Sequence, residues 1–158
     1  MKKIICLSMA VIVVWGSLVS CNLAGNGTEK ESNFYQLVVQ TQELLDTVAD
    51  DIYSNWYDAI YKDKFNESID LAILTAQIDN AENLDAIEEN NTKIKELYKQ
   101  IPDDSELKSE VKAVMQAYND YYTFVVEVSG SFNSYSANKE TLKKELSSAL
   151  KNLSFELE

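Results

Sequence analysis

The sequence predicts an all-α protein: an antiparallel bundle of about four helices in residues 33–158. Two observations lead to this prediction. The 158 residues include only one proline and four glycines, which is few turn residues for a sheet-rich fold but enough to punctuate long helices. In addition, apolar residues recur every three or four positions in four successive segments, as one buried face of an α-helix requires.

The first 20 residues carry a different pattern, that of an export signal. Lys2 and Lys3 precede an uncharged, mainly apolar run over residues 4–20, and this order of a basic and then an apolar region is typical of secretory signal peptides. The run is shorter than the roughly 20 apolar residues that a membrane-spanning helix needs. We therefore expect residues 1–20 to be a signal peptide that is cleaved.

Leu18, Val19 and Ser20 come directly before Cys21, and these four residues resemble the lipobox of bacterial lipoproteins. The resemblance covers residues 1–21. It implies that the Cys21 sulphur is diacylated and that Cys21 becomes the mature N-terminus. Cys6 would leave with the signal, so no thiol would remain for a disulfide, a redox reaction or a metal. The alternative is a plain signal peptide or anchor helix with an incidental cysteine.

Residues 21–32 would link the lipid to the folded domain. They are polar, contain Gly25 and Gly27 and show no apolar periodicity, so we expect a flexible tether with a reach of roughly 18 Å. Without Lys2 and Lys3, 12 basic and 26 acidic residues remain, a net charge of 12 − 26 = −14. Because anionic headgroups repel such a domain, we expect acyl chains to hold it on the extracytoplasmic face of the cell membrane.

The composition also limits the chemistry. All 14 basic residues are lysine, and histidine is absent. A chain with this charge and no arginine is unsuited to nucleic acid, and the lack of histidine excludes Ser-His and Cys-His catalysis and removes the commonest metal ligand. We expect no catalytic residue, metal or cofactor. The lysine- and asparagine-rich composition is typical of an AT-rich genome, which together with a lipobox fits a Gram-positive bacterium.

The first two helices are expected over residues 33–61 and 66–100. The buried face of the second is interrupted by Asn80, Asn83 and Asn90, and this helix would be so long that it either protrudes or breaks near residues 80–83. The expected apolar positions are Leu37, Val38, Leu45, Val48, Ile52 and Ala59 in the first helix and Ile69, Ile73, Ala76, Ile87, Ile94, Leu97 and Ile101 in the second.

Pro102 ends the second helix, and residues 103–106 read as a capping box that opens the third. We expect the third helix to end at Gly130 in a left-handed conformation, residues 131–135 to form a loop, and Ser136 to cap the fourth helix. The expected buried positions are Leu107, Val111, Val114, Tyr118, Tyr121, Val125 and Val128 in the third helix and Leu142, Leu146, Ala149, Leu150 and Leu153 in the fourth.

Tyr53, Asn55 and Trp56 are the first candidate binding residues, because they lie in an aromatic stretch at the end of the first helix. Aromatic side chains with polar tips are common at recognition surfaces. The alternative is that Tyr53, Trp56 and Ile60 line one edge of the core while Tyr57 and Tyr61 cover the end of the bundle.

Asn80 and Asn83 are the second candidates, since a buried amide without a partner costs about 1 to 3 kcal/mol. With Asn55 and Asn90 they lie on faces that are otherwise apolar. We expect these amides to pair with one another or across the bundle and so fix helix register. Two alternatives remain open: they line a polar cavity for a ligand, or the seam meets solvent there.

Residues 55–60 and 128–136 are similar to segments of small helical exported proteins of Gram-positive bacteria and their phages, and the resemblance implies no reaction. The expected function is therefore a membrane-tethered, non-catalytic module that binds another protein at the cell surface. A prophage-type immunity or superinfection-exclusion lipoprotein is the alternative. A third hypothesis is an enzyme acting on wall glycan, which would require a pair of carboxylates in a pocket.

Overall fold

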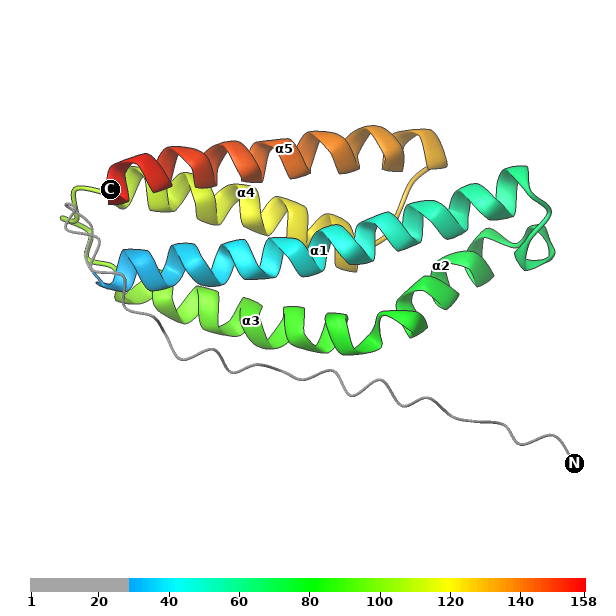
Figure 1. Ribbon diagram of the computed structural model, residues 1–158, viewed down its shortest axis with the longest axis horizontal. Coiled ribbons are helices and arrows are strands. Elements are labelled where there is room, and N and C mark those ends of the chain that lie inside the picture. The colour runs from blue at the N-terminus through cyan, green and yellow to red at the C-terminus, as the bar shows by residue number, and fades with distance from the viewer. Residues whose placement is uncertain (1–28) are drawn as a thin grey trace, which may run out of the picture.

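A computed structural model describes residues 29–158 and confirms that this part of the chain is helical, without a strand among its residues. The signal peptide, Cys21 and residues 22–28 lie outside the described residues. Figure 1 shows the helices in order. They are α1 (Glu29–Tyr61), the short 3-10 turn η1 (Phe65–Glu67), α2 (Ile69–Asp79), α3 (Ala81–Gln100), α4 (Lys108–Val126) and α5 (Phe132–Leu157).

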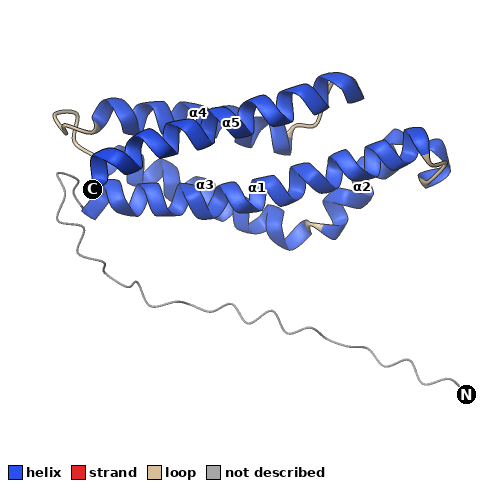
Figure 2. Ribbon diagram, turned by 45° about the horizontal axis from the view of Figure 1, so that its top comes forward, coloured by secondary structure: helices blue, strands red, loops and turns tan. Residues whose placement is uncertain are grey.

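Helix α1 is the centre of the arrangement, because it packs against each of the other four α-helices. Helices α2 and α3 follow one another along α1, and α4 and α5 pack closely together. In Figures 1 and 2 the chain turns back at each long connection, and the C-terminus lies near the start of α1. None of the helices in residues 29–158 has the length and apolar character needed to cross a membrane.

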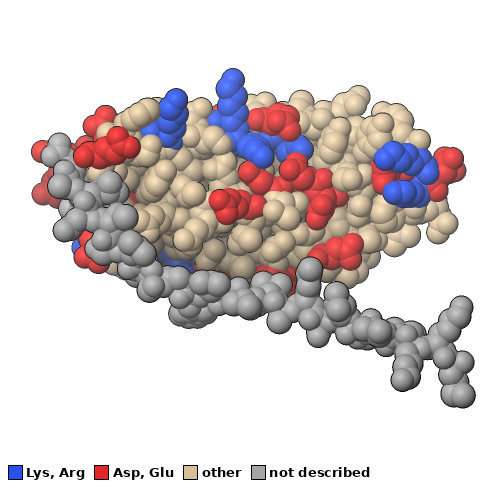
Figure 3. Space-filling model, in the orientation of Figure 1, with Lys and Arg blue, Asp and Glu red and all other residues tan. Residues whose placement is uncertain are grey.

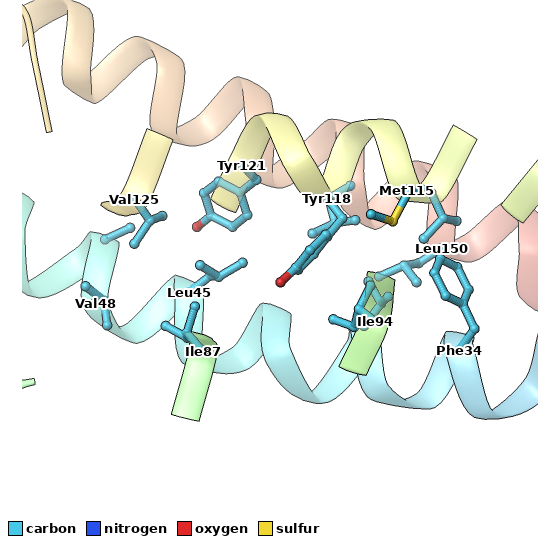
Figure 4. Packing of buried hydrophobic residues seen from close by; sticks show 14 of the residues in the cluster. Phe34, Leu45, Val48, Ile87, Ile94, Met115, Tyr118, Tyr121, Val125 and Leu150 are labelled. Atoms are coloured by element: carbon cyan, nitrogen blue, oxygen red, sulfur yellow. The ribbon is translucent and has the colours of Figure 1, made fainter. Parts of the chain in front are cut away.

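The regular pattern of the third predicted helix is confirmed in α4. Its Tyr118 and Tyr121 are fully buried, and Figure 4 shows both rings pointing from α4 toward α1, near Leu45 and Val48. Large side chains at alternating spacings of three and four thus fill the space between these helices, as the sequence predicts. The main departures from the predicted helices occur where helices begin and end.

The expected long helix over residues 66–100 is two helices that meet at Asn80. Of the two predicted alternatives, a break near residues 80–83 is correct, and a single protruding helix is wrong. Asn80 has φ −106° and ψ 20°, and it is both the C-cap residue of α2 and the N-cap residue of α3. The start is also later than predicted, because Ser68 caps α2 by accepting a hydrogen bond from the Leu71 amide.

Helix α1 begins at Glu29, so the predicted tether is four residues too long at its end: residues 29–32 are helical. The Glu31 carboxylate favours this extension because it lies in the first turn, where acidic groups stabilise the helix dipole. Its Oε1 also accepts a hydrogen bond of 2.6 Å from the Ser105 hydroxyl in the connection between α3 and α4. The start of α1 at Glu29 could not be predicted from the spacing of apolar residues, because this contact is between residues distant in the sequence.

The capping prediction at residues 103–106 is wrong. Helix α4 starts after Leu107 without a side-chain cap, and the capping box lies instead at Ser131 and Ser134, which open α5 five residues earlier than predicted. Gly130 has the expected positive φ, +89°. It does not end α4, however, which stops at Val126, but precedes the cap of α5.

Candidate functional site

The first predicted pair, Tyr53 and Trp56, packs against the beginning of α5. Trp56 is buried, and its ring centroid lies 5.5 Å from that of Tyr135 and 6.0 Å from that of Phe132. Tyr53 is half-buried and stacks on Phe132, with 5.2 Å between the two ring centroids. Lys139 Nζ lies 4.7 Å from the centroid of the Tyr53 ring. These positions match the core interpretation of Tyr53 and Trp56, whereas Ile60, expected at the same edge of the core, is exposed.

The predicted amides lie together on the side of α1 that faces α2. Asn55 Nδ2 donates to the Ala72 carbonyl at 3.3 Å. Asn80 is buried, and its Nδ2 donates to Asp51 Oδ2 at 2.8 Å and to the Ala76 carbonyl at 3.0 Å. Asn83 Nδ2 donates to Asn80 Oδ1 at 2.8 Å. The expected pairing of seam amides is therefore confirmed for Asn80 and Asn83.

The fourth seam amide was assigned one residue too early. Asn90 is half-buried, whereas Asn91 is buried and its Oδ1 accepts a hydrogen bond of 3.5 Å from the Tyr118 hydroxyl. Asn90 and Asn91 stand three and four residues after the fully buried Ile87, so the helical period admits either of them between Ile87 and Ile94 and does not choose.

An exposed group of apolar side chains is not predicted by the sequence pattern. Seven of the eight exposed large hydrophobic side chains among residues 29–158 belong to one continuous segment, residues 57–78. We call them the 57–78 surface: Tyr57, Ile60, Tyr61, Ile69, Leu71, Leu74 and Ile78. The exposed fraction reaches 59% for Tyr61 and 64% for Ile78. Exposed large apolar side chains are typical of binding surfaces where they lie side by side.

Helix α2 provides the larger part of this surface because it has partners on one side only. Its buried side chains are the small Ala72 and Ala76, which face α1. Within residues 29–158, α2 contacts α1, η1 and α3 but neither α4 nor α5. The prediction that Ile69 and Ile73 line the core is wrong for Ile69, which is exposed, while Ile73 is half-buried.

A strained turn joins the two parts of the 57–78 surface. Asp63, Phe65, Asn66 and Glu67 have φ values between 51° and 60°, a left-handed conformation that is unfavourable for residues other than glycine. Asp58 Oδ1 and Oδ2 lie 2.8 Å from Lys62 Nζ and 2.5 Å from Lys64 Nζ, so ion pairs close the turn. Hydrogen bonds from these two lysines lower the pKa of Asp58.

A second charged group joins α1 to α5. Lys139 is buried and contacts Asp50 and Glu140, and Lys143 Nζ lies 3.0 Å from Asp46 Oδ2. Figure 3 shows lysine and acidic side chains gathered at the middle of the molecule and again at one end. Asp50 and Asp46 of α1 are thus paired with Lys139 and Lys143 of α5, so these ion pairs link the two helices.

The described surface has an open hollow of about 310 Å³ at the kink, lined by Ile78, Asp79, Ala81, Glu82 and Asn83. A further hollow, of about 350 Å³, lies between α4 and α5 beside Phe155. No group of three or more acidic, histidine or cysteine side chains in residues 29–158 is arranged to hold a metal ion. The arrangement is suited to binding through apolar contacts, with acidic groups beside them.

Comparisons of the chain with protein-family models, with curated proteins and with solved structures found no match.

Proposed function

We propose that this protein is a membrane-tethered bacterial lipoprotein that binds another protein, without catalysis, at the extracytoplasmic face of the cell membrane. In this proposal its domain is an antiparallel four-helix bundle, with α2 and α3 together forming one of the four rods. The observation that carries the proposal is the 57–78 surface, in which seven large apolar side chains are exposed within 22 residues of sequence.

The 57–78 surface has an energetic cost that binding would offset. Full burial of an aliphatic side chain of this size contributes roughly 1.5 to 3 kcal/mol, and each of these side chains, 39% to 64% exposed, forgoes part of it. The left-handed residues of the turn between α1 and α2 add backbone strain, which persists only where the surrounding structure enforces it. A surface with both features supports a role in recognition more than a role in stability.

The proposed anchor suits this surface. Cys21 precedes the first residue of α1 by eight positions, while the 57–78 surface begins near the other end of α1. A helix of 33 residues is about 50 Å long. A lipid on Cys21 would thus hold one end of the domain near the bilayer and leave the opposite end, with the start of α2, accessible to a partner (Figure 1).

Photo-crosslinking in the producing cells tests this function. A photoreactive phenylalanine analogue replaces Leu74, which is 51% exposed on α2, in the full-length tethered protein. The matched control places the same analogue at Glu145, an exposed position on α5. We expect a discrete protein adduct from position 74 and none from position 145. Equal capture at both positions, or no adduct at position 74, would contradict the proposal.

A further inference from the structure

Helix α2 presents an ordered apolar stripe rather than scattered apolar residues. Leu71, Leu74 and Ile78 are spaced by three and four positions and are 42%, 51% and 64% exposed. This spacing places them on one face, on the side of the helix away from the buried Ala72 and Ala76. A stripe of this kind is complementary to the apolar face of another helix.

The stripe leads into the hollow at the kink. Ile78 belongs to both features, and the carboxylates of Asp79 and Glu82 line the hollow beside it. The backbone at the kink is held by Asn80, whose side chain is hydrogen-bonded to Asp51, to the Ala76 carbonyl and to Asn83. These bonds hold the end of α2, which carries the stripe, against the start of α3, which carries Glu82.

The segment of sequence that holds this stripe carries charge of one sign. Residues 65–92 contain no basic residue and seven acidic ones: Glu67, Asp70, Asp79, Glu82, Asp85, Glu88 and Glu89. Neither Asp79 nor Glu82 has an ion-pair partner in the described part of the chain, whereas Glu89 is paired with Lys93. A bound partner would bring its own charges close to these carboxylates, and basic groups would be attracted to them.

We propose that the stripe and the hollow together bind a cationic amphipathic helix of a partner protein. Apolar side chains at a spacing of three and four residues pack on Leu71, Leu74 and Ile78, and a lysine or arginine of the partner lies in the hollow beside Asp79 and Glu82. This inference rests on the proposed function and defines the partner of the same surface.

Charge also distinguishes this partner from the other possible occupants. A second copy of the chain would bring its own seven acidic residues against the same segment, and like charges at an interface oppose association. An anionic bilayer would repel residues 65–92 for the same reason. A basic helix satisfies the apolar and the electrostatic requirements together.

The test measures binding of synthetic helical peptides to the full-length chain, immobilised through its C-terminus. The first probe is a peptide of about 18 leucine and lysine residues with the leucines on one helix face. The second has the same leucines and glutamate in place of every lysine. We expect the lysine peptide to bind at least about tenfold more tightly, and its affinity to fall as salt screens the charges.

Paired variants then locate the site. Leu74→Ser with Ile78→Ser should weaken binding of the lysine peptide by about tenfold or more, since two central apolar contacts are removed. Phe155→Ser is the matched control, because Phe155 is 61% exposed on α5. Asp79→Asn with Glu82→Gln should weaken binding and its dependence on salt, while Asp120→Asn with Glu145→Gln, which removes the same charge elsewhere, should change neither.

The proposal fails if the glutamate peptide binds as tightly, or if the α2 variants behave like their controls. It also fails if Leu74 and Ile78 are instead required for binding to phosphatidylglycerol vesicles or for dimerisation on a sizing column. Circular dichroism confirms that each variant folds. A protein adduct from position 74 in cells without preference for the lysine peptide would refute this inference and leave the proposed function standing; no adduct would refute the proposed function itself.

Discussion

The buried Tyr121 hydroxyl of α4 donates a hydrogen bond of 2.7 Å to Asp46 Oδ1 of α1. The other oxygen of the same carboxylate, Oδ2, lies 3.0 Å from Lys143 Nζ of α5. One partly exposed acidic side chain therefore joins three helices at the middle of the domain. Because the phenol is buried and the carboxylate reaches solvent, the two partners should respond differently to substitution.

Removal of Asp46 should destabilise the domain more than removal of the Tyr121 hydroxyl. Tyr121→Phe leaves Asp46 paired with Lys143, so we expect a loss of about 1 kcal/mol. Asp46→Ala leaves the buried hydroxyl without an acceptor, and we expect a loss of about 2 to 3 kcal/mol. Urea unfolding of both variants checks the order. If the loss of stability in the double variant equalled the sum of the two single losses, the hydrogen bond between Tyr121 and Asp46 would not be the cause of the destabilisation.

Alkaline pH should unfold the domain. Burial raises the pKa of Tyr118, Tyr121 and Tyr135 far above the ordinary value of 10 and raises that of Tyr122 to about 12. Above pH 10 the unfolded chain loses protons that the folded chain retains, so the free energy of unfolding falls as pH rises. Each buried tyrosine contributes a slope of about 1.4 kcal/mol per pH unit, up to the pKa of its folded form.

Unfolding by denaturant between pH 9 and pH 11.5 measures this slope, and phenolate absorbance follows deprotonation of the buried tyrosines. The absorbance from Tyr118, Tyr121 and Tyr135 should rise only as the domain unfolds. Tyr121→Phe should reduce the slope. A wild-type slope near zero above pH 10 would show that the buried phenols lose their protons without unfolding.

The sequence predicted the regular parts of the fold because burial there follows the helical period. Tyr118, Tyr121 and Val125 are fully buried as expected. It failed at the start of α5, where Ser134 replaces the glutamate or glutamine of the usual capping box, and at the start of α1, where Glu31 is held by the distant Ser105. Contacts of this kind depend on tertiary structure and have no local periodicity.

The candidate site shows the same limit. Asn80 and Asn83 were recognised as amides that need partners, and they are paired. The exposed stripe of α2 could not be predicted, because its isoleucines and leucines look like core residues. The small Ala72 and Ala76 are buried instead, where α2 lies against α1 and Asn55 binds the Ala72 carbonyl. Which of two apolar faces is buried is decided by the neighbouring helix.

The kink should depend more on Asn80 than on Asn83. Asn80→Ala removes three hydrogen bonds at a buried position, and we expect a loss of about 2 to 3 kcal/mol. Asn83→Ala removes one bond at a half-buried position and should cost about 1 kcal/mol or less. Thermal unfolding of the two variants provides the comparison. Equal losses would mean that the amide network does not hold the kink.

Lipid attachment should depend on Cys21. Cys21→Ala removes the only thiol in the lipobox, so incorporation of labelled fatty acid and stable retention in the membrane fraction should both be lost. Cys6→Ala is the matched control and should change neither. Cell fractionation after metabolic labelling provides the measurement. Label on the Cys21→Ala protein would exclude this residue as the lipid acceptor.

Gly130 should be required for the start of α5. Its φ of +89° is unfavourable for any side chain, and a Cβ atom at this position would lie 2.9 Å from Ser134 Oγ. That oxygen accepts a hydrogen bond from the Ser131 amide and belongs to the capping box. We therefore expect Gly130→Ala to cost about 2 to 3 kcal/mol, as backbone strain and loss of the cap act together.

A double-variant cycle separates these two causes. Ser134→Ala alone should cost about 1 kcal/mol, because it removes the bond from the Ser131 amide to Ser134 Oγ without adding strain. In the double variant Gly130→Ala, Ser134→Ala the clash is absent, so only the cost of the positive φ is added to the loss of this bond. The combined loss should then be smaller than the sum of the two single losses. Strict additivity in chemical denaturation would mean that the Cβ atom at position 130 does not disturb Ser134, and that the conformation of Gly130 alone accounts for its effect.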